Sequence, residues 1–136
     1  MKILWLLAAL CSPLLATQAH AYTADELRGD CQIAEEMYAG QKSSDPFQSI
    51  RSARCIAYVA GFADSYAISE YLAGKVGVKL NAFCLPNDPD LSLRLVRAVV
   101  IHVERVPPNT TVGTATLVAG ALAKAFPCSD TLEPKK

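Results

Sequence analysis

Four cysteines constrain this chain more than any other feature of its sequence. They are Cys31, Cys55, Cys84 and Cys128, and a fifth, Cys11, lies in an apolar N-terminal segment. An even number of cysteines in a small exported domain indicates disulfides. The competing interpretation is a zinc site, but the four positions include no C-x-x-C pair and no neighbouring histidine. We therefore expect two disulfides, and neither a metal nor another cofactor.

The N-terminal segment has the three parts of a secretory signal peptide. Lys2 gives a positive start, residues 3–15 are almost entirely apolar, and a small-x-small motif ends at Ala21. The apolar run is too short to span a bilayer. Lipidation of Cys11 is disfavoured because the residue before it, Leu10, is bulky. We therefore expect cleavage after Ala21 and export to the periplasm.

Cleavage would divide the chain into a signal peptide at 1–21, one domain at 22–128 and a polar tail at 129–136. The discarded segment explains part of the hydrophobic content of 51%. No later stretch reaches the roughly 18 apolar residues of a membrane helix, so no membrane insertion is expected after cleavage. Without Lys2, the 13 acidic residues slightly outnumber the basic ones, which disfavours a nucleic-acid partner.

Helical periodicity and capping signals predict an all-α fold of about four helices. The first helix is expected over 24–39, because Thr23 and Glu26 have the spacing of a capping box. The second is expected over 46–73, because Asp45-Pro46 combines a cap residue with a proline in the first turn.

The last two helices are expected on either side of a pair of prolines. The third should follow a cap at Asp90 or Ser92 and end near Val106. The fourth should follow a cap at Thr110 or Thr111, include Phe126 and end at Pro127-Cys128.

The second helix is expected to be covered on several sides. Its middle, from Cys55 to Ala67, is apolar nearly all round, which is typical of a buried helix. Gly61 lies in this stretch and is expected to admit the close approach of another helix. Residues 74–90 are rich in Gly, Pro, Asn and Asp and should form a long loop that Cys84 pins.

Short links between the helices favour a small antiparallel bundle, and this geometry predicts the disulfide pairing. Cys31 lies about as far before the end of the first helix as Cys55 lies after the start of the second, so both sit at one height in a hairpin. Cys84 precedes the third helix and Cys128 follows the fourth. Among three possible pairings we therefore predict Cys31–Cys55 and Cys84–Cys128.

The sequence offers no catalytic constellation, since hydrolase, metalloprotease, P-loop and dinucleotide motifs are absent. His102 is expected to be structural. Asp64 is interpreted as bonded to a neighbouring helix or facing a groove, with an acid–base group of raised pKa as the alternative. Glu35 and Glu36 point in different directions and form no carboxylate pair. We therefore expect a protein that is not an enzyme.

The third helix has two chemically different faces. Its expected core positions are Leu95, Val96, Val99 and Val103. Its other face carries Arg94, Arg97, Ile101 and Arg105. That second face is either a solvated surface or a protein-binding patch.

Three motifs, in order and with the cysteines in register, resemble the Rap/Tai immunity proteins. Cys55 to Asp64 resembles the family's C-x-x-Y-x-x-G-x-x-D helix. Phe83 to Pro86 resembles its F/V-C-L-P turn, and Leu117 to Cys128 its closing A-L-x-x-A-F-P-C helix. The similarity spans residues 31–128, essentially the whole mature domain.

The resemblance implies a periplasmic, all-helical protein, often a homodimer, that neutralises a peptidoglycan amidase effector of type VI secretion. It also implies inhibition by a protruding loop that plugs the amidase's Cys–His groove.

The residues themselves suggest which loop would act as the plug. Our candidate is Val106-Pro107-Pro108-Asn109-Thr110, because a loop whose prolines restrict its backbone loses little entropy on docking. Arg94, Arg97 and Arg105 would contact an acidic rim and speed encounter. The alternatives are that the prolines only end a helix, or that the 74–90 loop makes the contact.

Two rival functions remain. One is a general cell-envelope helical binding or chaperone-like protein of unknown partner. The other is a small secreted enzyme, which the missing nucleophile and scarce histidine disfavour.

Overall fold

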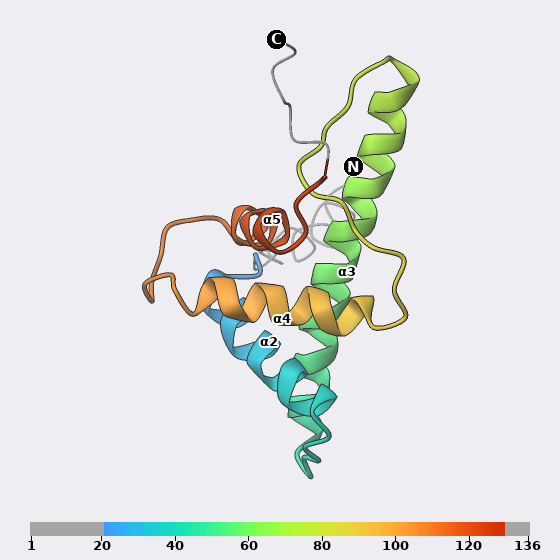
Figure 1. Ribbon diagram of the computed structural model, residues 1–136. Coiled ribbons are helices and arrows are strands. Elements are labelled where there is room, and N and C mark those ends of the chain that lie inside the picture. Colours follow the sequence, from blue (N-terminus) through green and yellow to red (C-terminus); the bar gives the residue numbers. More distant parts are fainter. Residues whose placement is uncertain (1–20, 130–136) are drawn as a thin grey trace, which may run out of the picture.

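The computed structural model describes residues 21–129, and this part of the chain is built from helices and loops without strands (Figure 1). The helices are α2 (Ala24–Tyr38), α3 (Pro46–Lys75), α4 (Leu91–Val103) and α5 (Thr114–Ala125). The predicted all-α fold of four helices is thereby confirmed. No helix among the described residues is long and apolar enough to cross a membrane. The expected signal peptide, up to residue 20, and the tail from residue 130 lie outside the described residues.

Local sequence signals set the starts of α2 and α3 as predicted. The Thr23 hydroxyl accepts a hydrogen bond from the Glu26 N–H (3.2 Å), and the Glu26 carboxylate accepts one from the Thr23 N–H (2.9 Å). The Asp45 carboxylate accepts from the Phe47 N–H (2.9 Å), with Pro46 in the first turn. These caps satisfy N–H groups that have no partner within their own helix.

The boundaries of α4 and α5 differ from the predicted ones. The N–H groups of Arg105 and Val106 bond carbonyls three residues back, so α4 tightens into a turn after Val103. The predicted threonine cap of α5 is wrong. The Thr110 hydroxyl instead accepts from the Val112 N–H (3.2 Å), and Gly113 occupies the cap position without a side-chain bond.

One hydrophobic core is shared by all four helices. The predicted inward stripe of α4 is confirmed, since Leu95, Val96, Val99 and Val103 are all at most 4% exposed. Apolar side chains of α5 are also buried, namely Leu117, Val118 and Leu122, as is Phe126 at its C-cap. This burial supplies most of the favourable free energy of folding.

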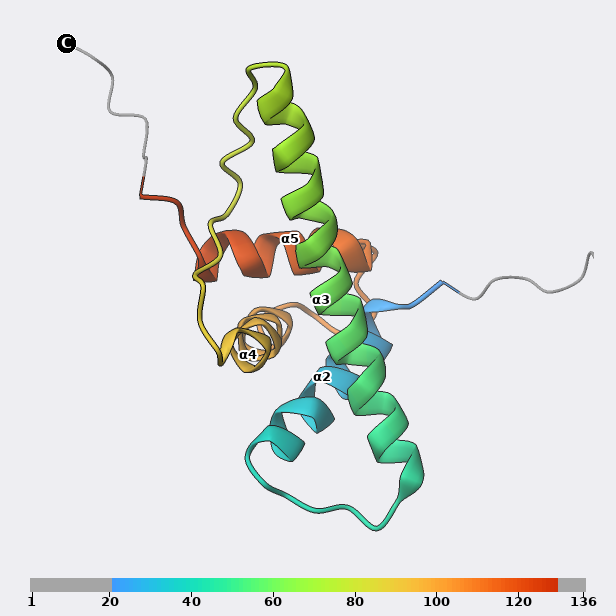
Figure 2. The same ribbon diagram turned by 90° about the vertical axis from the view of Figure 1, so that its right-hand side faces the viewer.

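The expectation that α3 is covered on several sides is wrong. The helix buries only the row formed by Ser52, Cys55, Val59 and Ala63. Gly61 lies on the exposed side, and a Cβ built there would meet nothing within 4 Å, so none of the helices described here approaches it closely. The three other described helices are too few to cover all sides of a helix of 30 residues, and the last turns of α3 extend beyond α4 and α5 (Figures 1 and 2).

Both predicted disulfides are confirmed. Cys31–Cys55 joins α2 to α3 inside the core, where both cysteines are 0% exposed. Cys84–Cys128 joins the segment before α4 to the segment after α5. Each bridge therefore closes a loop that contains one end or both members of a pair of consecutive helices, α2 and α3 for the first bridge and α4 and α5 for the second.

The last turns of α3 and the loop that returns from them form a projection, residues 67–82, which we call the arm (Figure 1). At its far end Gly77 has φ +77°, and the Val78 N–H bonds the Ala73 carbonyl (2.9 Å) in a Schellman turn. At its base the Tyr66 ring stacks on Phe83 at 3.9 Å between centroids, and the Tyr66 hydroxyl accepts from the Ala82 N–H (2.8 Å). The arm is therefore held at both ends.

Candidate functional site

The segment between α4 and α5, residues 104–113, is tied to the body of the domain at both ends, and we call it the connector. At its start the guanidinium of Arg28 donates to the carbonyls of Val103 (3.1 Å) and Val106 (2.8 Å). Just beyond its end the Thr114 hydroxyl donates to the Tyr22 carbonyl (2.6 Å). The connector's ends are therefore fixed before any partner binds.

The middle of the connector is exposed, and in Figure 1 it bulges outward at the left. Pro107, Pro108 and Asn109 are exposed, while Val106 and Thr110 are half-buried. Asn109 adopts φ +58°, a left-handed conformation that asparagine tolerates better than most residues. The structure thus gives the five predicted contact residues a defined, protruding backbone.

The predicted α4 face is exposed, but most of its charge is already neutralised. Arg94 pairs with Asp88 (2.7 Å), and Arg97 pairs with Glu35 (2.9 Å). Arg105 is exposed and has no ion pair among the described residues, and Ile101 is 46% exposed. The face therefore offers one unpaired cation beside an apolar side chain, rather than three free arginines.

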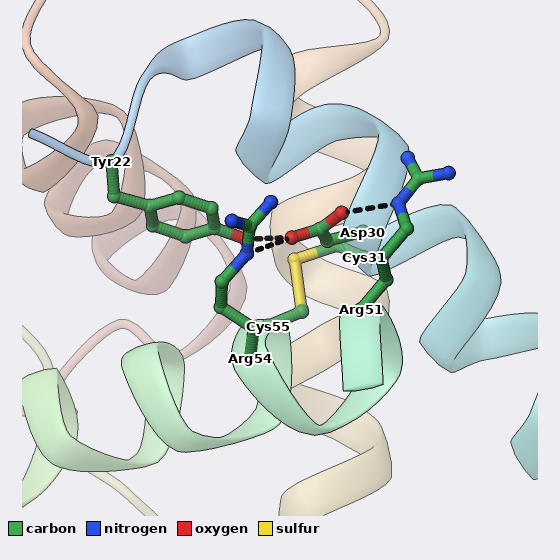
Figure 3. Close-up of a disulfide and its surroundings, with 6 residues drawn as sticks. All are labelled: Tyr22, Asp30, Cys31, Arg51, Arg54 and Cys55. Carbon is green, nitrogen blue, oxygen red and sulfur yellow. Dashed lines mark hydrogen bonds and ion pairs between the residues drawn. A yellow bond between two sulfur atoms is a disulfide. The ribbon is translucent and has the colours of Figure 1, made fainter. Parts of the chain in front are cut away.

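A buried carboxylate that sequence reasoning missed organises the region beside the connector (Figure 3). Asp30 is 0% exposed and accepts hydrogen bonds from Arg51 (2.8 Å), Arg54 (2.6 Å) and the Tyr22 hydroxyl (3.0 Å). It adjoins the Cys31–Cys55 bridge, so one turn of α2 is tied to α3 both covalently and by ion pairs.

The same contacts set the protonation of this cluster. Burial alone raises the pKa of Asp30, but the hydrogen bonds from Arg54, Arg51 and Tyr22 outweigh it and hold the pKa below its usual range. Burial, and then the Asp30 carboxylate, raise the pKa of Tyr22 well above its ordinary value. The cluster is therefore a fixed carboxylate with a neutral phenol, which suits a structural support rather than a proton-transfer site.

A shallow depression lies between this cluster and the connector. Its lining includes Tyr22, Tyr58, Thr110, Val112 and Thr114. The Tyr22 and Tyr58 rings meet edge to face at 5.0 Å, so the wall on that side is aromatic and rigid. The depression therefore lies where the segment before α2 and the middle of α3 meet the end of the connector and the start of α5.

The described residues include neither a free thiol nor a candidate metal site. Every cysteine among residues 21–129 is in a disulfide, and no group of three His, Cys, Asp or Glu residues in that range could hold a metal. His102 packs against α5, where a Cβ at Gly120 would lie 3.2 Å from its Nε2. Burial, together with Lys124 and Arg105, lowers the pKa of His102. Asp64 is exposed, and among the described residues it forms no hydrogen bond to a neighbouring helix. The expected bond to a neighbouring helix is therefore wrong, and the alternative of a buried acid–base group loses its basis.

Two supporting residues escaped the sequence analysis for different reasons. Asp30 carries a signal, because it falls on the buried side of α2 with Leu27, Cys31 and Ala34. A charge on that stripe indicates a buried partner. Arg28 carries no such signal, because its partners are backbone carbonyls 75 and 78 residues away.

Comparison with protein families finds a match that covers nearly all of the described chain. The family model of Rap1a immunity proteins matches residues 23–128. Neither the curated proteins nor the solved structures contain a significant match.

Proposed function

The chain belongs to the Rap1a immunity protein family, and from this premise we propose that it neutralises a secreted effector by binding it. The observation that carries the proposal is the family match over residues 23–128, since it covers the whole helical domain. Immunity proteins act by binding, so we propose a stoichiometric binder rather than an enzyme.

We propose further that the effector is a peptidoglycan amidase of type VI secretion and that the encounter takes place in the periplasm. The signal-peptide pattern that ends at Ala21 and the two disulfides both suit an oxidising compartment outside the cytoplasm. Tyr22 already contributes to the fold, because its hydroxyl donates to Asp30 and its carbonyl accepts from Thr114. Cleavage before Tyr22 would therefore leave the domain 22–128 complete.

The connector is the segment we assign to the amidase groove. Its exposed residues Pro107, Pro108 and Asn109 project from a backbone that Arg28 and Thr114 hold at either end. A loop held in this way loses little conformational entropy on docking. Ile101 and Arg105 of the neighbouring face would then contact the rim of the groove.

A toxicity rescue tests the proposal. A peptidoglycan amidase effector is exported to the periplasm with and without the full-length chain, and cell lysis is followed. We expect rescue, and a stoichiometric complex when the two purified proteins are mixed. Lysis at an unchanged rate together with no complex would overturn the immunity function.

A general cell-envelope binding or chaperone-like role is the second candidate, and one observation favours it. The arm exposes several large apolar side chains, including Val76 at 76% and Val78 at 50%. A pull-down from periplasm that returned many unfolded clients and no amidase would favour this role. The homodimer implied by the family resemblance is also part of our proposal, and the arm bears on it.

A further inference from the structure

One row of α3 points away from the core along the arm side of the helix. Its members are Asp64, Ile68, Tyr71, Leu72 and Lys75, all exposed and spaced so that they share one helix face. We call this row the outer face. The three apolar members are 61%, 64% and 59% exposed. Large apolar side chains gathered within five residues of one helix face in this way mark an interaction surface.

The outer face has opposite charges at its two ends. Asp64 lies at one end and Lys75 at the other, about 16 Å apart along the helix at 1.5 Å per residue. Neither residue forms an ion pair within the described chain, and the Lys75 ammonium instead lies 4.8 Å from the centre of the Tyr71 ring. The face is therefore an apolar centre between an unpaired acid and an unpaired base.

We propose that this face binds the same face of a second copy, with the two α3 helices antiparallel. This deepens the homodimer named above by assigning its interface. In the register that places Asp64 of one copy opposite Lys75 of the other, Ile68 also falls opposite Tyr71. The two-fold axis then repeats each contact, as a closed dimer requires.

The charges favour a second copy over the other possible occupants. An anionic membrane would match Lys75 but would repel and desolvate Asp64. An unfolded client needs an adaptable surface, whereas the Schellman turn at Gly77 and the Tyr66–Phe83 stack fix this one. A partner whose base lies opposite Asp64 and whose acid lies opposite Lys75 pairs both charges, and an antiparallel second copy is such a partner.

The size of the face sets the expected strength. A standard interface buries about 800 Å² per partner, and three helical turns provide less than that. We therefore expect a dimer that dissociates on dilution, to be followed by sedimentation velocity of the mature protein from micromolar to millimolar concentration.

A charge swap tests both the dimer and its register. Asp64→Lys gives two bases on the face and Lys75→Glu gives two acids, so each variant alone should dissociate at least tenfold more readily. An equimolar mixture should restore association, because each base then meets an acid of the other variant. The double variant Asp64→Lys/Lys75→Glu should dimerise as the unmodified protein does.

Glu70→Lys is the matched control, because it makes the same charge change on another side of the same helix. It should leave the dimer unchanged. A protein that is monomeric at every concentration would overturn the proposal, as would single variants that stay dimeric or a mixture that stays dissociated. Effector binding is measured on the same variants, so failure of the interface and failure of the immunity function are distinguishable.

Discussion

The guanidinium of Arg28 binds the carbonyl oxygen of Val106 at 2.8 Å, so the first helix of the domain fixes the start of the connector. The same group also reaches the Val103 carbonyl at 3.1 Å, the last residue of α4. Carbonyls at a helix end have no partner within the helix. Arg28 therefore joins the Val106 N–H in capping the Val103 carbonyl at the end of α4, and it orients the segment that follows.

Arg28→Met tests this role, because methionine keeps most of the aliphatic stem and removes the donors. We expect the free energy of unfolding to fall by about 1–3 kcal/mol, since two carbonyls lose a charged donor. Amide hydrogen exchange should accelerate in residues 104–110 more than elsewhere. Asp25→Ala is the control, because it removes only the exposed ion pair with Arg28 and should cost less than about 1 kcal/mol. Unchanged exchange in the connector would contradict the role.

Asp30 should make the free energy of unfolding depend on pH in the acid range. Its pKa is lowered in the folded state, against about 3.9 for an unfolded chain, so its contribution is present above that value and is lost as pH falls through the folded pKa. Asp30→Asn should cost about 2 kcal/mol near neutral pH, less than a fully buried pair because Arg51 and Arg54 are half-exposed. The difference in the free energy of unfolding between the unmodified protein and Asp30→Asn, measured by urea denaturation, should stay constant down to about pH 5. It should become smaller below pH 4. A gap that widened in acid would refute this assignment.

The sequence predicts the helices and the disulfides well because both depend on local or strongly constrained signals. The Thr23 capping box and Pro46 each lie within one turn of the boundary they set, and four cysteines allow only three pairings. Which faces of α3 are buried could not be predicted. An apolar helix has the same sequence pattern whether helices of its own chain or those of another chain pack against it. The connector's residues could be named from the prolines, but its anchoring by Arg28 depends on contacts 78 residues apart.

The two disulfides should differ in their contribution to stability. Loop-closure entropy alone gives about 3.5 kcal/mol for Cys31–Cys55 and about 4 kcal/mol for Cys84–Cys128. Burial should nevertheless make the Cys31–Cys55 bridge the larger contributor to stability. Both of its cysteines are 0% exposed, and their replacement by alanine leaves a void in the core. We expect the Cys31→Ala/Cys55→Ala protein to unfold at lower urea than the Cys84→Ala/Cys128→Ala protein. The opposite order would show that chain entropy dominates in this fold.

Two helical glycines should respond oppositely to alanine. A Cβ at Gly61 meets nothing within 4 Å, so Gly61→Ala should raise the free energy of unfolding by about 0.5–1 kcal/mol through helix propensity. A Cβ at Gly120 lies 3.2 Å from the His102 Nε2, so Gly120→Ala should lower it by about 1 kcal/mol. Thermal unfolding of both variants checks the contrast. In a His102→Ala background, Gly120→Ala should become stabilising; if it remains destabilising, the imidazole is not the cause.

Replacing Pro107, Pro108 and Asn109 together by glycine should weaken the amidase complex without unfolding the domain. The change removes the proline constraint, so the connector must lose more entropy on docking, and we expect at least about tenfold weaker binding, or 1.4 kcal/mol, in a calorimetric titration. Stability should fall by only about 1–2 kcal/mol, because the segment is exposed and the anchors at Arg28 and Thr114 remain. Glycine at residues 78–80 of the arm is the matched control, with three exposed residues of the other projecting loop changed. Unchanged affinity for the connector variant would exclude the connector as the plug, and a loss confined to the control would assign the contact to the 74–90 loop.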